Sequence, residues 1–291
     1  SEAQRLMQHL RRAGDASFLF GMELFNDFFS KWHPDAREQP DAPSSPWRSD
    51  CCDVTGMHPA VLGQDFHYYL DTSAVEAEAH RTAARVASEW GCVLTFDYHM
   101  KARYPAPNGG TFEFTEENRN LVYNIGEGND TYSELKWFTL HGELDRVIDE
   151  IRALGRPIVL RPFHEMNGKW FWWGPKAVGG AQSYQKFFRF TVSYIRIRAN
   201  TDLALFAWSP NFPFDDKAIE YFPGADVVDV IGLDVYDIGK PNSPSWPEFK
   251  ESVTAMGCFA HKHGKVAAVT ETGNRRRSPE QHPSWWWLVR T

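Results

Sequence analysis

The chain has 291 residues, of which 42% are hydrophobic and 24% charged, with a formal net charge of −7. This length fits one large α/β barrel, and the hydrophobic content is ample for an extended core. The acidic balance, without any Lys/Arg-rich stripe, argues against a nucleic-acid partner. No apolar run reaches the roughly 18–20 residues that a membrane span requires.

The predicted elements repeat a unit of helix, glycine and strand. Gly91, Gly155 and Gly264 each follow a helical pattern, where glycine supplies the left-handed conformation that ends a helix. Short, nearly all-apolar strands that alternate with amphipathic helices indicate a parallel sheet covered by helices. The expected helices cover 74–90, about 140–154, 183–199 and 246–263, and the expected strands begin near 18, 61, 92, 157, 203, 227 and 265.

The pattern favours a (β/α)8 TIM barrel over an open sheet, because no phosphate-binding glycine fingerprint follows the first strand. We expect one catalytic domain over residues 1–291. Seven strands are identifiable, and the eighth is missing, because only 20 residues follow Glu271. Either the sequence is truncated at its C-terminus or the barrel closes in an unusual way.

Cysteine spacing and the N-terminus bear on metal content and location. The four cysteines lack the paired Cys-x-x-Cys spacing of a structural zinc site, so no metal or other cofactor is predicted. They would form one or two disulfides in a secreted protein, with a pairing that the sequence leaves open. The cysteines are Cys51, Cys52, Cys92 and Cys258.

The chain starts at Ser1 without a signal-like apolar stretch and is interpreted as a mature, secreted protein, extracellular or periplasmic.

Polar residues follow the predicted strands at one end. The carboxyl ends of all barrel strands point to the same face, where active sites lie, so these residues are expected to converge. In chain order they are Glu23, Asp65, His67, His99, Arg161, His164, Glu165, Trp208, Asn211, Asp234, Tyr236 and Glu271.

The stretch 161–174, RPFHEMNGKWFWWG, places Glu165 just before four large aromatic side chains. Flat rings next to carboxylates suit a polyhydroxylated ligand, because the rings stack on C–H faces of a sugar while polar groups bind its hydroxyls. Glu271, in AAVTETG, ends another apolar run. Two such carboxylates are the minimal equipment for cleaving a glycosidic bond.

Three segments together resemble glycoside hydrolase family 26: RPFHEMNGKWFWWG, VVDVIGLDVYD and VTETG. The resemblance runs from about residue 17 to the end of the chain. It implies a (β/α)8 barrel, a retaining mechanism and, in most members, action on β-1,4-mannan. By this resemblance Glu165 is the general acid/base, and Glu271 is the nucleophile.

The same resemblance implies sugar-binding roles for further residues. Tyr236 would hydrogen-bond the nucleophile, Asp234 would be an acidic partner near the acid/base, and Trp170 would stack on the substrate. The substrate-binding set is His99, His164, Trp170, Trp208, Asp234 and Tyr236. Arg161 is expected to orient a carboxylate rather than to touch sugar.

The spacing within the aromatic run adds an expectation about its shape. Four residues separate Glu165 from Trp170, enough for a short loop to fold the indole back beside the acid. Of Trp172 and Trp173, one would support Trp170 from below and the other would pack on the following helix.

The leading hypothesis is a retaining, endo-acting β-1,4-mannanase that acts as a monomer on mannan, galactomannan, glucomannan or manno-oligosaccharides. A related specificity for β-1,3-1,4-glucan or β-1,3-xylan stays open, because loop residues decide it. The sequence does not separate endo from exo action. A non-catalytic carbohydrate-binding barrel is the third reading, and the two glutamates argue against it.

Overall fold

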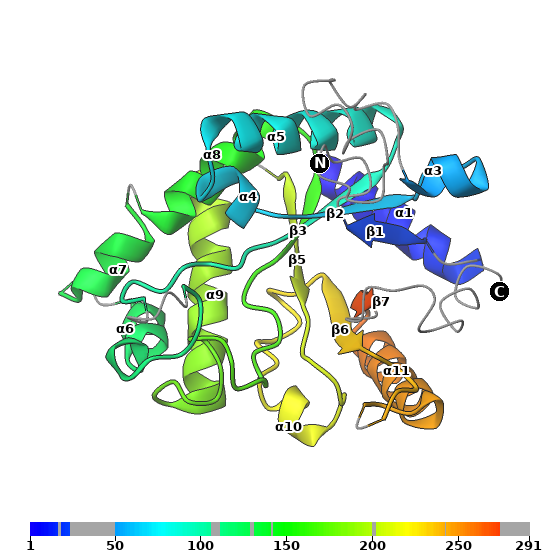
Figure 1. Ribbon diagram of the computed structural model, residues 1–291. Coiled ribbons are helices and arrows are strands. Elements are labelled where there is room, and N and C mark those ends of the chain that lie inside the picture. The colour runs from blue at the N-terminus through cyan, green and yellow to red at the C-terminus, as the bar shows by residue number, and fades with distance from the viewer. Residues whose placement is uncertain are drawn as a thin grey trace.

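The computed structural model describes residues 1–16, 19–23, 50–105, 111–128, 131–140, 142–199, 202–241 and 243–273. Seven parallel strands in these ranges form one sheet in sequential order. The sheet curls through the middle of the molecule as an incomplete barrel (Figure 1). The strands are β1 (Gly21–Glu23), β2 (Val61–Asp65), β3 (Val93–Asp97), β4 (Ile158–Arg161), β5 (Ala204–Trp208), β6 (Val230–Tyr236) and β7 (Val266–Gly273).

The helices between the strands confirm the predicted alternation. All four expected helices are present as α5 (Ala74–Glu89), α8 (Glu143–Leu154), α9 (Gly180–Ala199) and α11 (Trp246–Lys262). The N-terminal helix and several short helices are additional to the elements predicted from the sequence. These are α1 (Glu2–Ala16), α3 (Asp50–Thr55), α4 (His67–Leu70), α6 (Leu121–Gly126), α7 (Ser133–Phe138), α10 (Asp216–Ile219) and a 3₁₀ turn, η1 (Glu116–Asn118).

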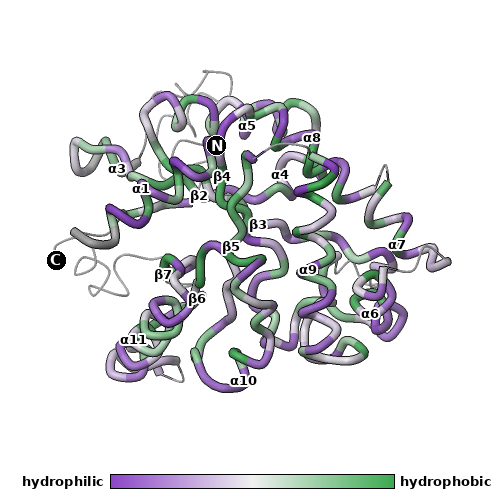
Figure 2. Tube along the Cα trace, turned by 180° about the vertical axis from the view of Figure 1, so that it is seen from behind, coloured by the Kyte–Doolittle hydropathy of each residue, from purple (hydrophilic) through white to green (hydrophobic). Residues whose placement is uncertain are grey.

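Alternate residues of each strand enter two different cores, as the period of two in a strand requires. Leu94, Leu160 and Phe206 point outward into the large core beneath the helices. Val93 and Val159 point inward into a smaller core, which α1 also contacts. The strands accordingly form the apolar centre of the chain, with polar residues on the outer turns of the helices (Figure 2).

Helix α1 lies across the amino ends of the strands. The Ala3 backbone N–H donates to the Asp202 carbonyl just before β5, and the Arg11 guanidinium donates to the Gly264 carbonyl just before β7. The helix therefore covers the end of the barrel opposite to the predicted site.

Among the described residues the sheet ends at β1 on one side and β7 on the other, which confirms the seven predicted strands. The expectation that an eighth strand is missing concerns the chain after residue 273, which lies outside the described ranges. Strand β7 is only partly buried along its length, as an edge strand would be. No helix in the described ranges is long and apolar enough to cross a membrane.

None of the four cysteines is in a disulfide, so the pairings considered from the sequence are not formed in the structure. Cys51 and Cys52 lie side by side in α3, and the Cys92 thiol donates to the Pro59 carbonyl at 3.2 Å.

Candidate active site

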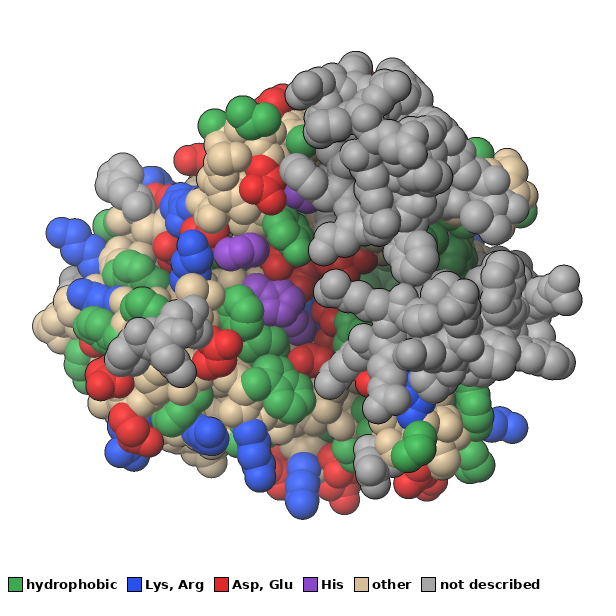
Figure 3. Space-filling view, viewed as in Figure 1, with side chains coloured by type: hydrophobic (Ala, Val, Ile, Leu, Met, Phe, Trp, Pro, Cys, Tyr) green, Lys and Arg blue, Asp and Glu red, His purple; other side chains and the backbone are tan. Residues whose placement is uncertain are grey.

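Three inward-pointing residues end neighbouring strands in one row. Asp65 on β2 is the register partner of Asp97 on β3, and Asp97 is the partner of Arg161 on β4. All three side chains are buried. Because parallel strands in register end side by side, two carboxylates and one guanidinium gather at the carboxyl end of the barrel. Acidic and histidine side chains accordingly cluster in the middle of this face (Figure 3).

A β-bulge directs Glu271 into the same space. Leu233 on β6 pairs with Val269, but the next residue, Asp234, pairs with Glu271, so Thr270 is the extra residue. A bulge bends its strand and re-aims the side chains beside it. As a result, both side chains point into the site: the Thr270 hydroxyl donates to Asp234, and the Glu271 carboxylate accepts from Arg161.

Glu271 is held by groups that favour its charged form. The Tyr236 hydroxyl donates to Oε2 at 2.6 Å, and the Arg161 guanidinium donates to Oε1. Burial alone would raise the pKa of Glu271, but Arg161 and the Tyr236 hydrogen bond outweigh it and lower the pKa to about 2. Glu271 is therefore ionised at neutral pH, as a nucleophile must be.

Glu165 has the opposite environment. Burial, and after it the negative charge of Glu271, raises the pKa of Glu165 to about 7. Its backbone adopts a left-handed conformation, with φ of 53°, and its N–H donates to the Ser209 carbonyl at 2.8 Å. Such a backbone is uncommon for a residue other than glycine and is often found at functional sites.

The two carboxyl groups lie close together: oxygens of Glu165, Asp234 and Glu271 all fall within 4.8 Å of one another. Retaining glycosidases separate their carboxyl groups by about 5–5.5 Å, whereas inverting enzymes leave a wider gap for water. One charged and one protonated carboxyl at this spacing can attack an anomeric carbon and protonate a leaving oxygen.

Trp170 lies over the acid, as its sequence spacing predicts. Its indole N–H donates to Glu165 Oε2 at 2.8 Å, and its side chain is 41% exposed. A Cβ at Gly168 would collide with the indole ring, so glycine is needed for this fold-back. The open ring face is available to stack on a ligand beside Glu165.

The other aromatics of the run are core residues. Trp172 and Trp173 are fully buried, and their indole N–H groups donate to the carbonyls of Met100 and His164. Trp172 contacts Phe187 of α9, which agrees with the expected packing on the following helix. The ring beneath Trp170 is Phe171, however, at a centroid distance of 6.2 Å, so the prediction that a tryptophan supports Trp170 is wrong.

Two histidines lie next to the carboxylates. His164 is buried, and its Nε2 is 3.8 Å from Glu271 Oε1. Burial, followed by the charge of Arg161, lowers the pKa of His164 to about 3, so this ring is neutral. His99 packs edge-on against His164 with ring centroids 4.6 Å apart. A direct sugar contact stays a prediction for both histidines.

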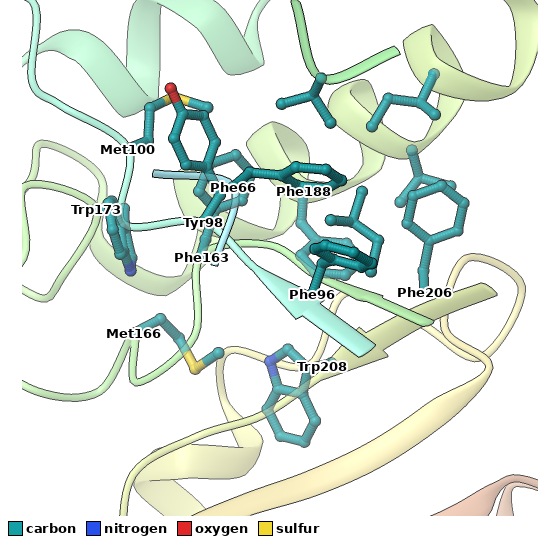
Figure 4. Close-up of a cluster of buried hydrophobic side chains, with 14 of the residues drawn as sticks. Phe66, Phe96, Tyr98, Met100, Phe163, Met166, Trp173, Phe188, Phe206 and Trp208 are labelled. Carbon is teal, nitrogen blue, oxygen red and sulfur yellow. The ribbon is translucent and has the colours of Figure 1, made fainter. Parts of the chain in front are cut away.

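Trp208 does not belong to the site, contrary to the prediction that it binds substrate. It is fully buried and, like Phe206, belongs to the large core beneath the helices, among whose side chains Figure 4 labels both. Its ring packs against Phe214 and Phe222. The alternation of side chains along β5 explains the error, because position 208 has the same parity as the outward-facing position 206.

Asp234 lies in the site but beneath its surface. It is 0% exposed, accepts hydrogen bonds from Arg161, Ser209 and Thr270 at 2.6–2.7 Å, and so has no surface to offer a sugar. The prediction that Asp234 binds substrate is therefore corrected. Its contacts fix the guanidinium of Arg161, which in turn orients Glu271, as the sequence analysis expects of Arg161.

Two groups have ligand types and spacing that suit a cation: Asp97 with His99 and His164, and Glu165 with Asp234 and Glu271. Arg161 reaches both groups. Its guanidinium is 2.7 Å from Asp234 Oδ2 and 3.7 Å from Asp97 Oδ2. The positive charge that these carboxylates require is thus supplied by an arginine side chain.

Sequence reasoning missed three polar residues of the site. Asp97 lies between His99 and Arg161, while Ser209 and Thr270 hold Asp234. The signal for Asp97 was present, because it has the same strand parity as Asp65 and Arg161. Thr270 had no such signal, since its orientation depends on the bulge.

The fold and the site together define a class. A barrel of parallel strands presents two glutamates at the ends of its fourth and seventh strands. One glutamate is kept charged, and the other holds a proton near neutral pH beside an exposed tryptophan. This is the arrangement of a retaining glycoside hydrolase.

The chain belongs to glycosyl hydrolase family 26, whose model matches residues 1–277. It is 27% identical to a mannan endo-1,4-β-mannosidase from Bifidobacterium adolescentis, over 94% of this chain and 27% of that protein. It is also 27% identical to the enzyme of the same name from Bacillus subtilis, over 63% of this chain and 52% of that protein. The chain thus spans about a quarter to a half of these relatives.

The solved structure of a modular endo-β-1,4-mannanase from Cellulomonas fimi has a similar fold. The two chains superpose with a TM-score of 0.74 and 28% sequence identity, over 94% of this chain and 60% of that one. Structures of this family are (β/α)8 barrels, so the seven strands described here correspond to most of that barrel.

Proposed function

We propose that this protein is a retaining endo-β-1,4-mannanase that cleaves mannan-type polysaccharides by double displacement. The observation that carries the proposal is a pair of neighbouring carboxyls in opposite environments: Arg161 and Tyr236 donate hydrogen bonds to Glu271, whereas burial and the charge of Glu271 raise the pKa of Glu165 to about 7. The choice of mannan is supported by the names of the two curated relatives and of the Cellulomonas structure.

In the first step, Glu271 attacks the anomeric carbon while Glu165 gives its proton to the leaving oxygen. Arg161 and Tyr236 hold Glu271 in place for this attack. When Glu271 becomes an ester, its negative charge disappears, and with it one of the two influences that raise the pKa of Glu165. Glu165 then ionises more readily and can activate the water that releases the sugar.

Trp170 connects the acid to the substrate. The indole donates a hydrogen bond to Glu165 and keeps a large part of its ring exposed. A sugar on the leaving-group side that stacks on this ring would bring its glycosidic oxygen close to the proton donor. Burying the apolar sugar face would contribute on the order of 1–3 kcal/mol.

Activity on a panel of polymers tests the proposal. Purified protein is incubated with mannan, lichenan and β-1,3-xylan, new reducing ends are measured, and product anomers are followed by NMR. Mannan cleavage at internal bonds with retained β-configuration is expected. Faster release of reducing ends from lichenan or β-1,3-xylan would show that the preferred substrate is that polymer and not mannan. Binding without cleavage would favour a non-catalytic carbohydrate-binding barrel.

The location of the protein is part of the same proposal. A mannan polymer is too large to enter a cell, so an endo-acting enzyme would be secreted and would work outside the cell or in the periplasm. The proposed oligomeric state is a monomer. Cell fractionation with an activity stain tests the location, and light scattering tests the oligomeric state. Activity confined to the cytoplasm would contradict it.

A further inference from the structure

The carboxylate of Asp65 has no role in the two-step reaction, yet it makes three hydrogen bonds at the edge of the site. Oδ1 accepts the backbone N–H groups of His67 at 2.8 Å and His99 at 3.1 Å. Oδ2 lies 2.8 Å from Nδ1 of the His99 ring. The Asp65 side chain is 7% exposed, and a carboxylate this buried is costly unless it is partnered.

These bonds join two loops and fix one ring. His67 begins α4 just after β2, and His99 lies two residues beyond the end of β3, the neighbouring strand (Figure 1). One carboxylate therefore ties the segments after two adjacent strands together. The His99 ring is held at Nδ1 by Asp65 and is packed against His164 and Phe171, at centroid distances of 4.6 and 5.4 Å. With Nδ1 occupied, Nε2 is the nitrogen left to meet a ligand.

The His99 ring is 29% exposed, on the face that carries Glu165 and Glu271. A second carboxylate, Asp97, places Oδ2 3.3 Å from the same Nδ1. Burial would lower the pKa of His99, but the hydrogen bonds with Asp65 and Asp97 outweigh it and raise the pKa to about 11. A protonated imidazole donates charge-assisted hydrogen bonds, which are about twice as strong as neutral ones.

We propose that Asp65 is a positioning residue, which clamps the His99 ring so that Nε2–H is a fixed donor to a hydroxyl of the bound sugar. The inference rests on the proposed function and adds to it the residue that orients one sugar contact. The titratable side chains that face the His99 ring are Asp65 from β2, Asp97 from β3 and His164 from the segment after β4.

A double-mutant cycle tests whether Asp65 acts through His99. Asp65→Asn and His99→Gln should each lower kcat/KM on mannan by about 10-fold or more, the loss of a hydrogen bond to a charged group. In the His99→Gln background, Asp65→Asn should cost less than about twofold, because the ring that it orients is gone. Independent losses that multiply would overturn the proposal.

Asp71→Asn is the matched control. Asp71 directly follows α4 and is similarly buried, but it pairs with His67 at 3.3 Å, Lys101 at 3.5 Å and Arg146 at 3.4 Å rather than with the His99 ring. This variant should lower thermal stability and leave kcat/KM within about twofold. A 10-fold loss in Asp71→Asn would show that the loop, rather than the clamp, controls activity.

Imidazole NMR tests the clamp even if Asp65→Asn does not fold. The wild-type protein at pH 7 should show a slowly exchanging, downfield N–H signal from His99, which is absent in His99→Gln. A neutral His99 ring without this signal would overturn the proposal. A wild-type protein that is inactive on all three polymers would instead refute the proposed function. The NMR result would still show whether Asp65 holds the His99 ring.

Discussion

Replacing the proposed acid with its uncharged isostere, Glu165→Gln, should stabilise the protein and the gain should grow with pH. The pKa of Glu165 is about 7 in the folded protein and about 4.5 in an unfolded chain. A carboxyl whose pKa is raised on folding binds more protons in the native state, so its ionisation destabilises that state as pH rises from 4.5 through 7. The full penalty, reached above pH 7, is about 3 kcal/mol, because each pH unit of difference corresponds to ~1.4 kcal/mol.

Urea unfolding at pH 5 and pH 8 measures this effect. At pH 5 the penalty in the wild-type protein is below about 1 kcal/mol, so Glu165→Gln should gain about 2–3 kcal/mol more at pH 8 than at pH 5. Glu271→Gln is the matched comparison and should lose stability at both pH values, because its ionised form is bonded to Arg161 and Tyr236. An equal gain for Glu165→Gln at both pH values would refute the raised pKa.

Four further outcomes follow from the site. Tyr236→Phe removes a 2.6 Å donor to Glu271 and should raise the acid-limb pKa of kcat/KM from about 2 to about 3–4; an unchanged pH profile would place Tyr236 in the scaffold. Glu271→Ala should abolish turnover, whereas Glu165→Ala should retain cleavage of aryl glycosides and yield a β-glycosyl azide when azide is added. Trp170→Phe removes a donor to ionised Glu165 and should move the alkaline limb to higher pH. Trp170→Ala should lower kcat/KM about 10-fold with little change in Tm, while Trp173→Ala should cost about 3–5 kcal/mol of stability; the reverse pattern would make Trp170 a core residue.

Local sequence patterns were sufficient for the main architecture. Helix α8 was predictable because its apolar residues recur at helical spacing, and strand β4 because its apolar residues are consecutive. Gly155, in a left-handed conformation, ends the helix between them. The same alternation places Glu165 and Glu271 at one end of the barrel. Helix α1 was missed because it lies outside the repeating unit and belongs to the closed end of the barrel.

The errors within the site came from side-chain direction. A strand-end position does not say whether its residue points into the barrel or out toward the helices, and Trp208 points out. Asp234 points in, but it is fully buried and its carboxylate is occupied by Arg161, Ser209 and Thr270. The bulge at Thr270 depends on pairing between β6 and β7, which no local pattern encodes.

The central claim, that Glu271 attacks the sugar, can be tested by trapping the covalent intermediate. The Glu165→Ala variant is mixed with an aryl β-mannoside that has a good leaving group, so that the first step proceeds and the second, which needs Glu165 as base, is slow. Intact mass spectrometry should show one added mannosyl group, and peptide mapping should place it on Glu271. A mannosyl group on another residue, or rapid turnover to α-configured product without any adduct, would contradict the assignment.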